Sequence, residues 1–433
     1  MEAVEASTMR KVYLRLLPFA VVCYILAYID RINGSFAALT MRGDLGMSAA
    51  DYGFAVGTFY WAYFLFEVPS NIVMEKVGAR IWIARIMVTW GIFATATAFV
   101  TGTTSFGIVR FLLGMGEAGF FPGLILYFTY WFPAKHHARI VSSFLVGLPI
   151  AVAVGAPVST GLMSLNGMFG LKGWQIMYIA EGLPTIVLGV VFYFVMTNKP
   201  EQATFLTREE KNWLAGKLAG ERKAREAVRV YSMWESMWNP KVLLLALNYF
   251  GIVTSSLGLL FFIPQIIKSL GTMSNMTVGW LTMIPYICAG ISLVVWGRIS
   301  DRMNERRWNL LVACVLSTVG LVLAGLTMGT WWALVGMSLA AMGFYGSKGP
   351  FFAMPPMFLS GTALAAGFAW INSIGNLGGF FGPWWIGIMK DATGSFAGGL
   401  YGLALLSLIS SLVCAFFLHI PDPTIAARPA LAD

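Results

Sequence analysis

The stretch Tyr28-Ile29-Asp30-Arg31-Ile32-Asn33 lies inside the first long apolar run of the sequence, residues 12–40. Two adjacent, opposite charges in such a run have no water to solvate them. A charged side chain at the centre of a bilayer costs at least about 2.5 kcal/mol, so such residues usually face a protein-lined cavity and have a function. We therefore interpret the chain as an all-α membrane protein with a polar site at Asp30 and Arg31.

The composition supports a membrane location. Of 433 residues, 58% are hydrophobic and only 11% are charged, and the mean hydropathy is +0.73. A soluble domain of this size would not stay in solution with this composition. The net charge of +9 could indicate nucleic-acid binding. However, the basic residues fall mainly in short loops, the pattern that sets orientation in a membrane. We expect a lipid bilayer around the chain and no nucleic-acid partner.

A spanning helix needs about 20 mostly apolar residues, and the sequence contains twelve such runs. They cover residues 12–40, 52–75, 80–100, 104–131, 139–166, 174–197, 241–270, 276–300, 307–328, 330–354, 361–389 and 395–419. The basic residues gather on one side of these spans. The positive-inside rule then places both termini in the cytoplasm. We expect a monomeric, multi-pass protein of a bacterial inner membrane.

The one substantial polar stretch divides the chain into two halves. We predict an N-terminal six-helix bundle over 1–197, a cytoplasmic linker over 198–240 and a C-terminal six-helix bundle over 241–433. Within the linker, Thr207 is placed to cap an amphipathic helix. Each half has a charged, glycine-containing turn after its second span, which indicates an internal duplication. We predict that these turns latch the cytoplasmic side through charge pairs and helix dipoles. The predicted gate residues are Glu75, Lys76, Arg80, Asp301 and Arg302.

Several longer strings carry a more specific signal. They are Tyr28–Asn33, Phe66-Glu67-Val-Pro69-Ser-Asn71, Gly114-Met-Gly-Glu117-Ala-Gly-Phe-Phe-Pro122, Gly173-Trp-Gln175 with Glu181-Gly-Leu-Pro184, and Ile371–Gly379. With the paired turns, they resemble the major facilitator superfamily and, within it, the anion:cation symporter family of galactonate, tartrate, phthalate and hydroxyphenylacetate permeases. The resemblance covers nearly the whole chain. It implies a two-bundle fold and proton-coupled uptake of an organic anion, with the proton as coupling ion and no other cofactor.

The sequence departs from the family pattern at three positions. Asn71 and Ala79 stand where the superfamily turn usually has glycine and a basic residue. Lys348, in a glycine-rich part of the tenth span, is not general to the family, and it is a candidate to set the substrate.

Arg31 is the first candidate ligand for an anion. Its planar guanidinium can hold a carboxylate through two hydrogen bonds, and the resemblance gives the matching arginine as a substrate ligand. A structural pair with Asp30 is the alternative, although adjacent helical residues point about 100° apart. Asp30 is predicted to bind the coupling proton, with charge balance for Arg31 or Arg110 as its alternative. Tyr28 is a weaker substrate-binding candidate.

Arg110 and Glu117 lie on the same face of the fourth span, about two helical turns apart. If charged Glu117 competes with the anion for Arg110, protonation of Glu117 frees Arg110 and couples one proton to one anion. The resemblance gives the matching glutamate a proton-coupling role, and a fixed interhelical pair is the alternative. Glu67 and Glu181 are expected near span ends, where they would cap helices or pair with gate residues such as Arg80.

Three residues of the second half are predicted to bind substrate. Lys348 would hold a second anionic group, with snorkelling or a pair with a buried acid as the alternative. Asn372 and Asn376 lie at i and i+4 on the eleventh span and share a face, so both could hydrogen-bond the substrate. Their alternative role is to join helices.

The sequence therefore predicts a proton-coupled symporter that imports an organic carboxylate by alternating access. Arg31, Arg110 and Lys348 exceed Asp30 and Glu117 by one positive charge, which favours a dicarboxylate or an aromatic acid such as tartrate or phthalate. An anion exchanger without proton coupling and a sugar-acid symporter remain open. Because the sequence contains no HExxH, no GxSxG and no clustered histidines, we expect neither an enzyme nor a metal site.

Overall fold

The computed structural model describes residues 2–145, 147–226, 235, 237–303, 305–359 and 361–417. Residues 227–234 and 236 of the predicted linker lie outside the described residues, as do residues 418–419 at the end of the last predicted span. All regular elements in the described part of the chain are helices, which confirms the predicted fold class.

The first half begins with the long helix α1 (Glu2–Asp44). It continues with α2 (Ala49–Val77), α3 (Ala79–Ala96), η1 (Thr97–Phe99), α4 (Thr103–Glu117), α5 (Phe120–Thr129), α6 (Ala134–Leu145), α7 (Gly147–Met163), η2 (Met168–Gly170) and α8 (Gly173–Val195). The polar connection contains η3 (Pro200–Gln202) and α9 (Arg208–Glu226). Each of the first six predicted spans thus coincides with one helix or with two consecutive helices.

The second half follows the same plan. Its elements are α11 (Pro240–Lys268), α12 (Asn275–Met303), α13 (Arg307–Leu326), α14 (Trp332–Gly346), α15 (Lys348–Ala353), η4 (Pro355–Met357), α16 (Gly361–Thr393) and α17 (Ala397–Phe417). Within the described residues, nine helical segments of the chain are long and apolar enough to cross a membrane by length and composition alone. The segments of α2, α14 with α15, and α16 complete the twelve predicted spans.

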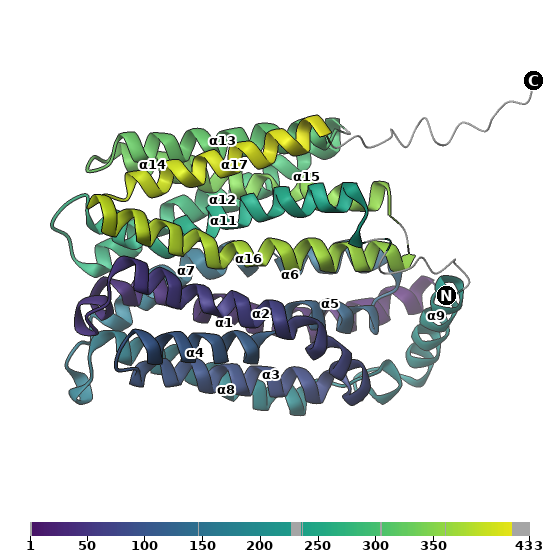
Figure 1. Ribbon diagram of the computed structural model, residues 1–433. Coiled ribbons are helices and arrows are strands. Elements are labelled where there is room, and N and C mark those ends of the chain that lie inside the picture. Colours follow the sequence, from purple (N-terminus) through teal and green to yellow (C-terminus); the bar gives the residue numbers. More distant parts are fainter. Residues whose placement is uncertain are drawn as a thin grey trace, which may run out of the picture. The chain divides into compact units, whose positions relative to one another are not determined.

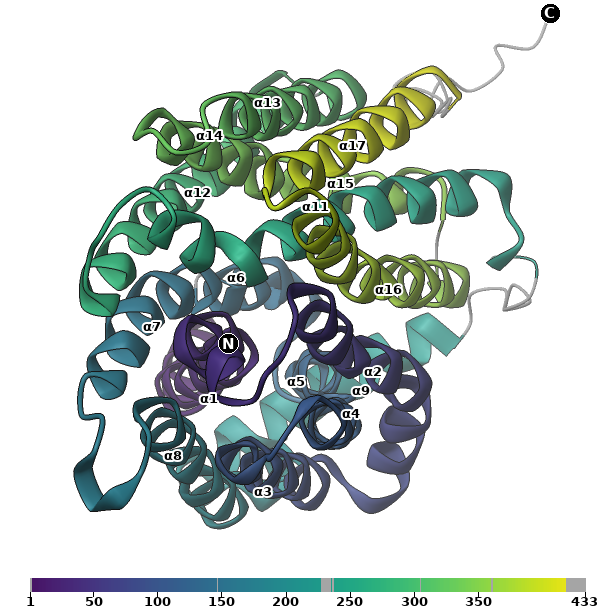
Figure 2. The same ribbon diagram turned by 60° about the vertical axis from the view of Figure 1, so that its left-hand side comes forward.

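The helices cluster into two compact units. The first holds α1 to α9 and the start of α12, Thr272–Met283, and the second holds α11, α12 from Ile284, and α13 to α17. In the first unit, α1 packs against α7, and α3 lies beside α8 (Figure 1). In the second unit, α11 packs against α16, and α13 packs against α17 (Figure 2). In each half the first span therefore packs on the fifth and the third on the sixth, as expected for an internal duplication.

The fourth predicted span of the first half is interrupted beside a charged residue. Helix α4 ends at Glu117, and Gly119 then has a φ of 90°, a conformation that favours glycine. A Cβ at Gly119 would lie 2.8 Å from the Cβ of Ser70, so the close approach also requires glycine. In the second half, α14 ends at Gly346 and α15 begins at Lys348, but Ser347 between them is helical: its amide donates to Gly343 and its carbonyl accepts from Phe351, both at 3.0 Å. Interrupted spanning helices leave backbone groups free to face a binding site.

The predicted gate residues make contacts inside their own unit. Arg80 donates from Nε to the carbonyl of Tyr193 and from its amide to Asn198 Oδ1, the latter at 2.8 Å, so it caps the end of α8. Asp301 pairs with Arg306 at 2.7 Å. The remaining predicted gate residues, Glu75, Lys76 and Arg302, are exposed. A gating role for the two turns stays a prediction.

The linker helix α9 is held against the first turns of α1 by an ion pair and a hydrogen bond. As predicted, Thr207 caps it, accepting from the Glu210 amide at 3.3 Å while Glu210 accepts from the Thr207 amide at 2.8 Å. Glu210 also pairs with Lys11 at 2.8 Å and accepts from Ser7 at 2.7 Å. Burial raises the pKa of the Glu210 carboxyl, but the bonds from Lys11, the Thr207 amide and Ser7 outweigh it and hold that pKa at about 2.

We expect the docking of α9 on α1 to weaken at low pH. Because the pKa of Glu210 is depressed from its ordinary value of 4.5, its contribution is complete above pH 4.5 and is lost as pH falls toward 2. Hydrogen exchange of the α9 amides, corrected for intrinsic rates, should show less protection at pH 3 than at pH 6, by about 1 kcal/mol. Glu210→Gln should be weakly protected at both values, whereas Glu209→Gln should behave as wild type. Equal protection of wild type at both values would contradict this account.

Candidate functional site

Arg31 on α1 and Glu117 at the end of α4 form a buried ion pair. Arg31 is 17% exposed and Glu117 1% exposed. The Arg31 guanidinium lies 5.2 Å from the ring centroids of Tyr28 and Phe59 and 5.3 Å from that of Tyr63. The rings belong to α1 and α2, so they surround the pair with apolar faces that exclude water and attract the cation.

Gly114 explains why the pair can form. A Cβ at Gly114 would collide with the Phe59 carbonyl, so glycine lets α4 approach the backbone of α2. Glu117 lies one helical turn beyond Gly114, close to the level of Phe59 and Tyr63. The sequence hypothesis that Glu117 competes for Arg110 is corrected here, because Glu117 contacts Arg31 instead. Arg110 is about 10 Å away along the axis of α4, too far for an easy contact within one helix.

Asp30 points away from Arg31, as adjacent helical residues must. It accepts hydrogen bonds from Trp90 Nε1 on α3 at 2.7 Å and from Thr185 Oγ1 on α8 at 2.8 Å. Both donors are neutral, and Asp30 forms no ion pair with Arg31 or Arg110 within the described residues. The charge of Arg110 still acts on Asp30, so charge balance with Arg110 stays an alternative. Asp30 is 1% exposed, and its Oδ1 has no hydrogen-bond partner among the described residues. A buried carboxyl oxygen without a partner leaves a position for a proton.

Arg110 occupies space that a glycine leaves open. A Cβ on Gly34 would overlap the Arg110 guanidinium, so this side chain lies directly against the backbone of α1. Arg110 donates to the hydroxyl of Tyr178 on α8 at 3.2 Å and lies 5.3 Å from the ring centroid of Phe106. It is 2% exposed, and no carboxylate pairs with it in the described part of the chain.

Glu181 is not at a gate, contrary to the sequence prediction. It is buried between α8, α1 and α7, where it accepts from Asn33 Nδ2 at 3.0 Å and from Ser159 Oγ at 2.7 Å. Arg80, its suggested partner, caps α8 two turns or more away. The apolar sequence around Glu181 does not reveal its depth in the span, which is why the prediction failed.

The polar residues of unit 1 thus meet around one turn of α1. Residues 30 to 34 supply Asp30, Arg31, Asn33 and the gap at Gly34, and each faces a different partner. Sequence reasoning did not find the neutral partners Trp90, Thr185, Tyr178 and Ser159, because no motif marks them. The described residues contain no group of three or more His, Cys, Asp or Glu that could hold a metal ion.

In unit 2, Lys348 lies at the start of α15 and its Nζ is 4.4 Å from the ring centroid of Tyr345. It forms no ion pair with any described residue, so the alternative of a pair with a buried acid is not realised there. Tyr249 on α11 stacks on Phe351 of α15 with centroids 4.9 Å apart. The same ring fills the position of a Cβ at Gly375 on α16. Tyr249 therefore links the helix of Lys348 to the helix of Asn372 and Asn376, which are both partly exposed.

The arrangement can perform two chemical tasks. Glu117 holds Arg31 only while it is charged, so protonation would release a guanidinium that is already shielded from water by three rings. Asp30, held by neutral donors, can exist with or without a proton. Nε of Arg31 and Oε2 of Glu117 have no hydrogen-bond partner among the described residues, which leaves the pair able to accept a further group.

Comparisons with known proteins agree with this architecture. The family model described as Major Facilitator Superfamily matches residues 20–383 and 245–433. A protein of Agrobacterium vitis named "Putative tartrate transporter" is 46% identical over 98% of this chain and 94% of its own length. The "Quinolone resistance transporter" of Acinetobacter baumannii is 37% identical over 94% of each chain. Among solved structures, a bacterial homolog of the human lysosomal transporter Spinster has a TM-score of 0.77 at 15% identity, covering 94% of this chain and 96% of that one.

Proposed function

The chain belongs to the major facilitator superfamily, and we propose that it is a proton-coupled symporter that imports an organic dicarboxylate such as tartrate. The superfamily consists of transporters rather than enzymes, so the buried charges serve binding and coupling. The observation that carries the proposal is the Arg31–Glu117 pair, in which a strong carboxylate ligand is held by a group that can be protonated. The relative named for tartrate supports the choice of substrate class.

Coupling follows from competition for one guanidinium. When Glu117 is charged, it occupies Arg31, and an incoming carboxylate must displace it. When Glu117 takes a proton, the anion forms the pair with Arg31 in its place. By linkage, the proton then raises affinity for the anion and the anion raises affinity for the proton by the same factor. Release of both into the cytoplasm re-forms the Arg31–Glu117 pair and resets the site.

Asp30 supplies a second proton site beside the first. With protons on Asp30 and Glu117, a dianion enters together with two positive charges, so each cycle moves no net charge. Arg110 raises the local positive potential, and Tyr28, Asn372 and Asn376 are proposed to orient the substrate. The second anionic group is assigned to Lys348.

Orientation and assembly complete the proposal. The excess of basic residues in the linker and at the predicted gate supports cytoplasmic termini in a bacterial inner membrane. We propose a monomer as the functional unit.

The proposal is tested by uptake into liposomes that contain the purified protein. A panel of mono- and dicarboxylates is offered with and without an inward proton gradient. Accumulation of a dicarboxylate that collapses with an uncoupler supports symport. If nothing accumulates but preloaded anion exchanges at a rate independent of pH, the protein is an exchanger and Asp30 and Glu117 have no coupling role. Accumulation of sugar acids in preference to tartrate would replace the substrate class and keep the mechanism.

Lys348→Met should separate the two classes of substrate. A lysine without a carboxylate partner in the described residues can form a charge-assisted bond to a second carboxylate, worth about 1.5–3 kcal/mol. We expect KM for a dicarboxylate to rise more than about tenfold and KM for a matching monocarboxylate to stay unchanged. Lys390→Met, at the far end of α16, is the matched control. An equal rise in KM for both substrates would show that Lys348 does not bind the second carboxylate.

A further inference from the structure

Arg85 is a charged residue in the spanning helix α3 that the transport site does not use. It is the seventh residue of α3, about 9 Å along the axis from the first. Its Nη1 lies 3.5 Å from Thr89 Oγ1, and its guanidinium lies 3.9 Å from the ring centroid of Trp82. No carboxylate pairs with Arg85 in the part of the chain that the structure describes.

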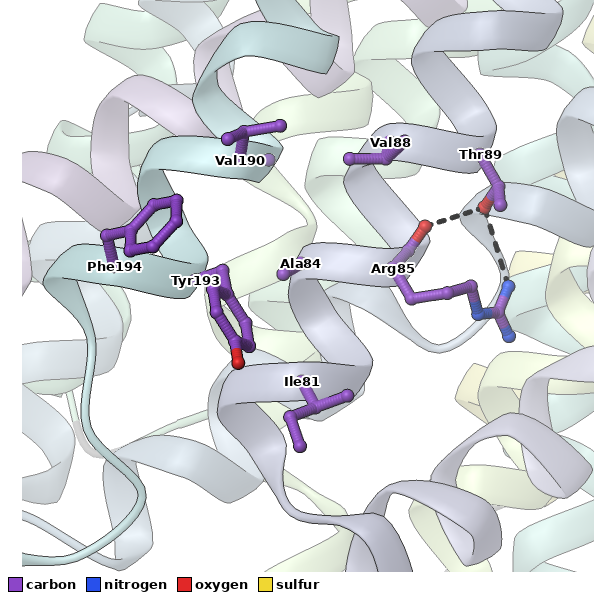
Figure 3. A pocket seen from close by; sticks show the side chains of 9 residues that line it. Ile81, Ala84, Arg85, Val88, Thr89, Val190, Tyr193 and Phe194 are labelled. Atoms are coloured by element: carbon purple, nitrogen blue, oxygen red, sulfur yellow. Dashed lines mark hydrogen bonds between the residues drawn. The ribbon is translucent and has the colours of Figure 1, made fainter.

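A groove of about 400 Å³ lies beside Arg85, between α3 and α8 (Figure 3). Apart from Arg85, Thr89 and Tyr193, its walls are apolar: Ile81, Ala84, Val88, Gly189, Val190 and Phe194. The large side chains of this wall are exposed, Phe194 to 73%, so the groove opens on the outer surface of unit 1. In a membrane-spanning unit, such an apolar surface faces lipid.

Glycine creates the floor of the groove. A Cβ at Gly189 would lie 2.9 Å from both the Met87 Cβ and a methyl of Val88, so glycine allows α8 to pack directly on α3. The groove is therefore a fixed consequence of close helix packing rather than of a mobile side chain. Val88 of α3 and Val190 of α8 both line it.

The positive charge of this region continues toward the start of α3. Arg80 lies 4.5 Å from the ring centroid of Tyr193, a residue of the groove wall, and Lys199 is exposed just beyond α8. Arg80 and Lys199 also lack a carboxylate partner among the described residues. A groove with apolar walls, one arginine midway along it and two further cations near the start of α3 matches an amphiphile with an anionic head. Basic pockets between spanning helices on the cytoplasmic side bind anionic lipid headgroups.

We propose that this groove binds an anionic phospholipid of the surrounding leaflet. The phosphate pairs with Arg85, whose guanidinium lies between Trp82 and Thr89 on the surface of α3, and Arg80 adds to the potential. One acyl chain lies along Ala84, Val88 and Val190. The phosphate supplies the counter-charge that the protein does not supply to Arg85. This site is independent of the proposed substrate and of proton coupling.

The test is native mass spectrometry of the full chain in detergent, titrated with dioleoylphosphatidylglycerol, dioleoylphosphatidylcholine or glycerol 3-phosphate. The wild type should bind one phosphatidylglycerol in preference to phosphatidylcholine. Arg85→Gln should weaken phosphatidylglycerol binding about fivefold, the value of one cation at an anionic surface. Phosphatidylcholine binding should not change. Glycerol 3-phosphate should bind weakly, because it offers no chain to the groove.

Two further variants distinguish a loss of lipid contacts from a loss of folding. Arg85→Lys keeps the charge and should keep the preference for phosphatidylglycerol. Val190→Trp keeps Arg85 but fills the groove, and it should lose lipid binding while the thermal unfolding temperature stays near that of wild type. Arg208→Gln, on the linker helix, is the matched charge control. Equal binding of both lipids by wild type, or unchanged phosphatidylglycerol binding by Arg85→Gln, would overturn the proposal.

Discussion

Replacing Arg31 with glutamine should abolish anion binding. Arg31 is the cation of the buried pair with Glu117, and three aromatic rings hold it in place. Loss of one partner of a buried, hydrogen-bonded charge pair costs at least about 3 kcal/mol, which corresponds to more than about 100-fold in affinity. Calorimetric titration with tartrate should detect no binding, and liposomes with the variant should neither accumulate nor exchange substrate.

A double variant separates binding from folding. Arg31→Gln leaves Glu117 buried without its cation, so it should also lower thermal stability. Arg31→Gln combined with Glu117→Gln removes both charges and should recover the unfolding temperature without recovering binding. Recovery of binding by the double variant would mean that Arg31 stabilises the bundle and does not hold the anion. Arg208→Gln, on the linker helix, should match wild type in both measurements.

Glu117→Gln should keep exchange of anions and lose proton-driven accumulation. A neutral glutamine holds Arg31 more weakly than a carboxylate does and its hold does not change with pH, so the guanidinium is available to the anion at every pH. Wild-type affinity for the dicarboxylate should fall as pH rises, because deprotonated Glu117 recaptures Arg31. The affinity of Glu117→Gln should be nearly constant over the same range. Counterflow in liposomes should persist, and an imposed proton gradient should no longer concentrate the substrate.

Two further variants show whether the effect of Glu117→Gln on proton-driven accumulation is specific to Glu117. Glu209→Gln, on the exposed face of α9, should accumulate substrate as wild type does. Asp30→Asn tests the second proton: if it alone abolishes accumulation, Asp30 is also required. Retained accumulation by Glu117→Gln would remove Glu117 from the coupling role and leave its pair with Arg31 as a structural one.

The fold could be predicted from the sequence because each spanning helix needs a run of about 20 mostly apolar residues, which is visible in the sequence. The twelve apolar runs coincide with the helices found, and the paired charged turns indicated the duplication that the packing of α1 on α7 and α11 on α16 repeats. The interruption after Glu117 was not predicted. The residues around it are as apolar as those of a continuous helix, and the non-helical backbone angles of Ala118 and Gly119 distinguish them.

The site was predicted as a set of residues but not as a set of contacts. Asp30, Arg31, Arg110 and Glu117 were chosen because charges in apolar runs are costly. Their partners depend on the rotation of helices, and Arg31 and Glu117 are 86 positions apart. Sequence reasoning could relate Glu117 only to residues on its own helix, so it selected Arg110. The depth of Glu181 was missed for a related reason, since hydropathy does not fix a position within a long span.

The space left by Gly34 limits which substitutions this position can accept. Every single-base change that replaces this glycine with another amino acid introduces a residue with a Cβ, and at this position a Cβ overlaps the Arg110 guanidinium. Even alanine, the smallest of these residues, would displace the arginine from the backbone of α1. The genetic code therefore offers this position no replacement that leaves the Arg110 guanidinium where it lies, and any change here moves that charge away from α1.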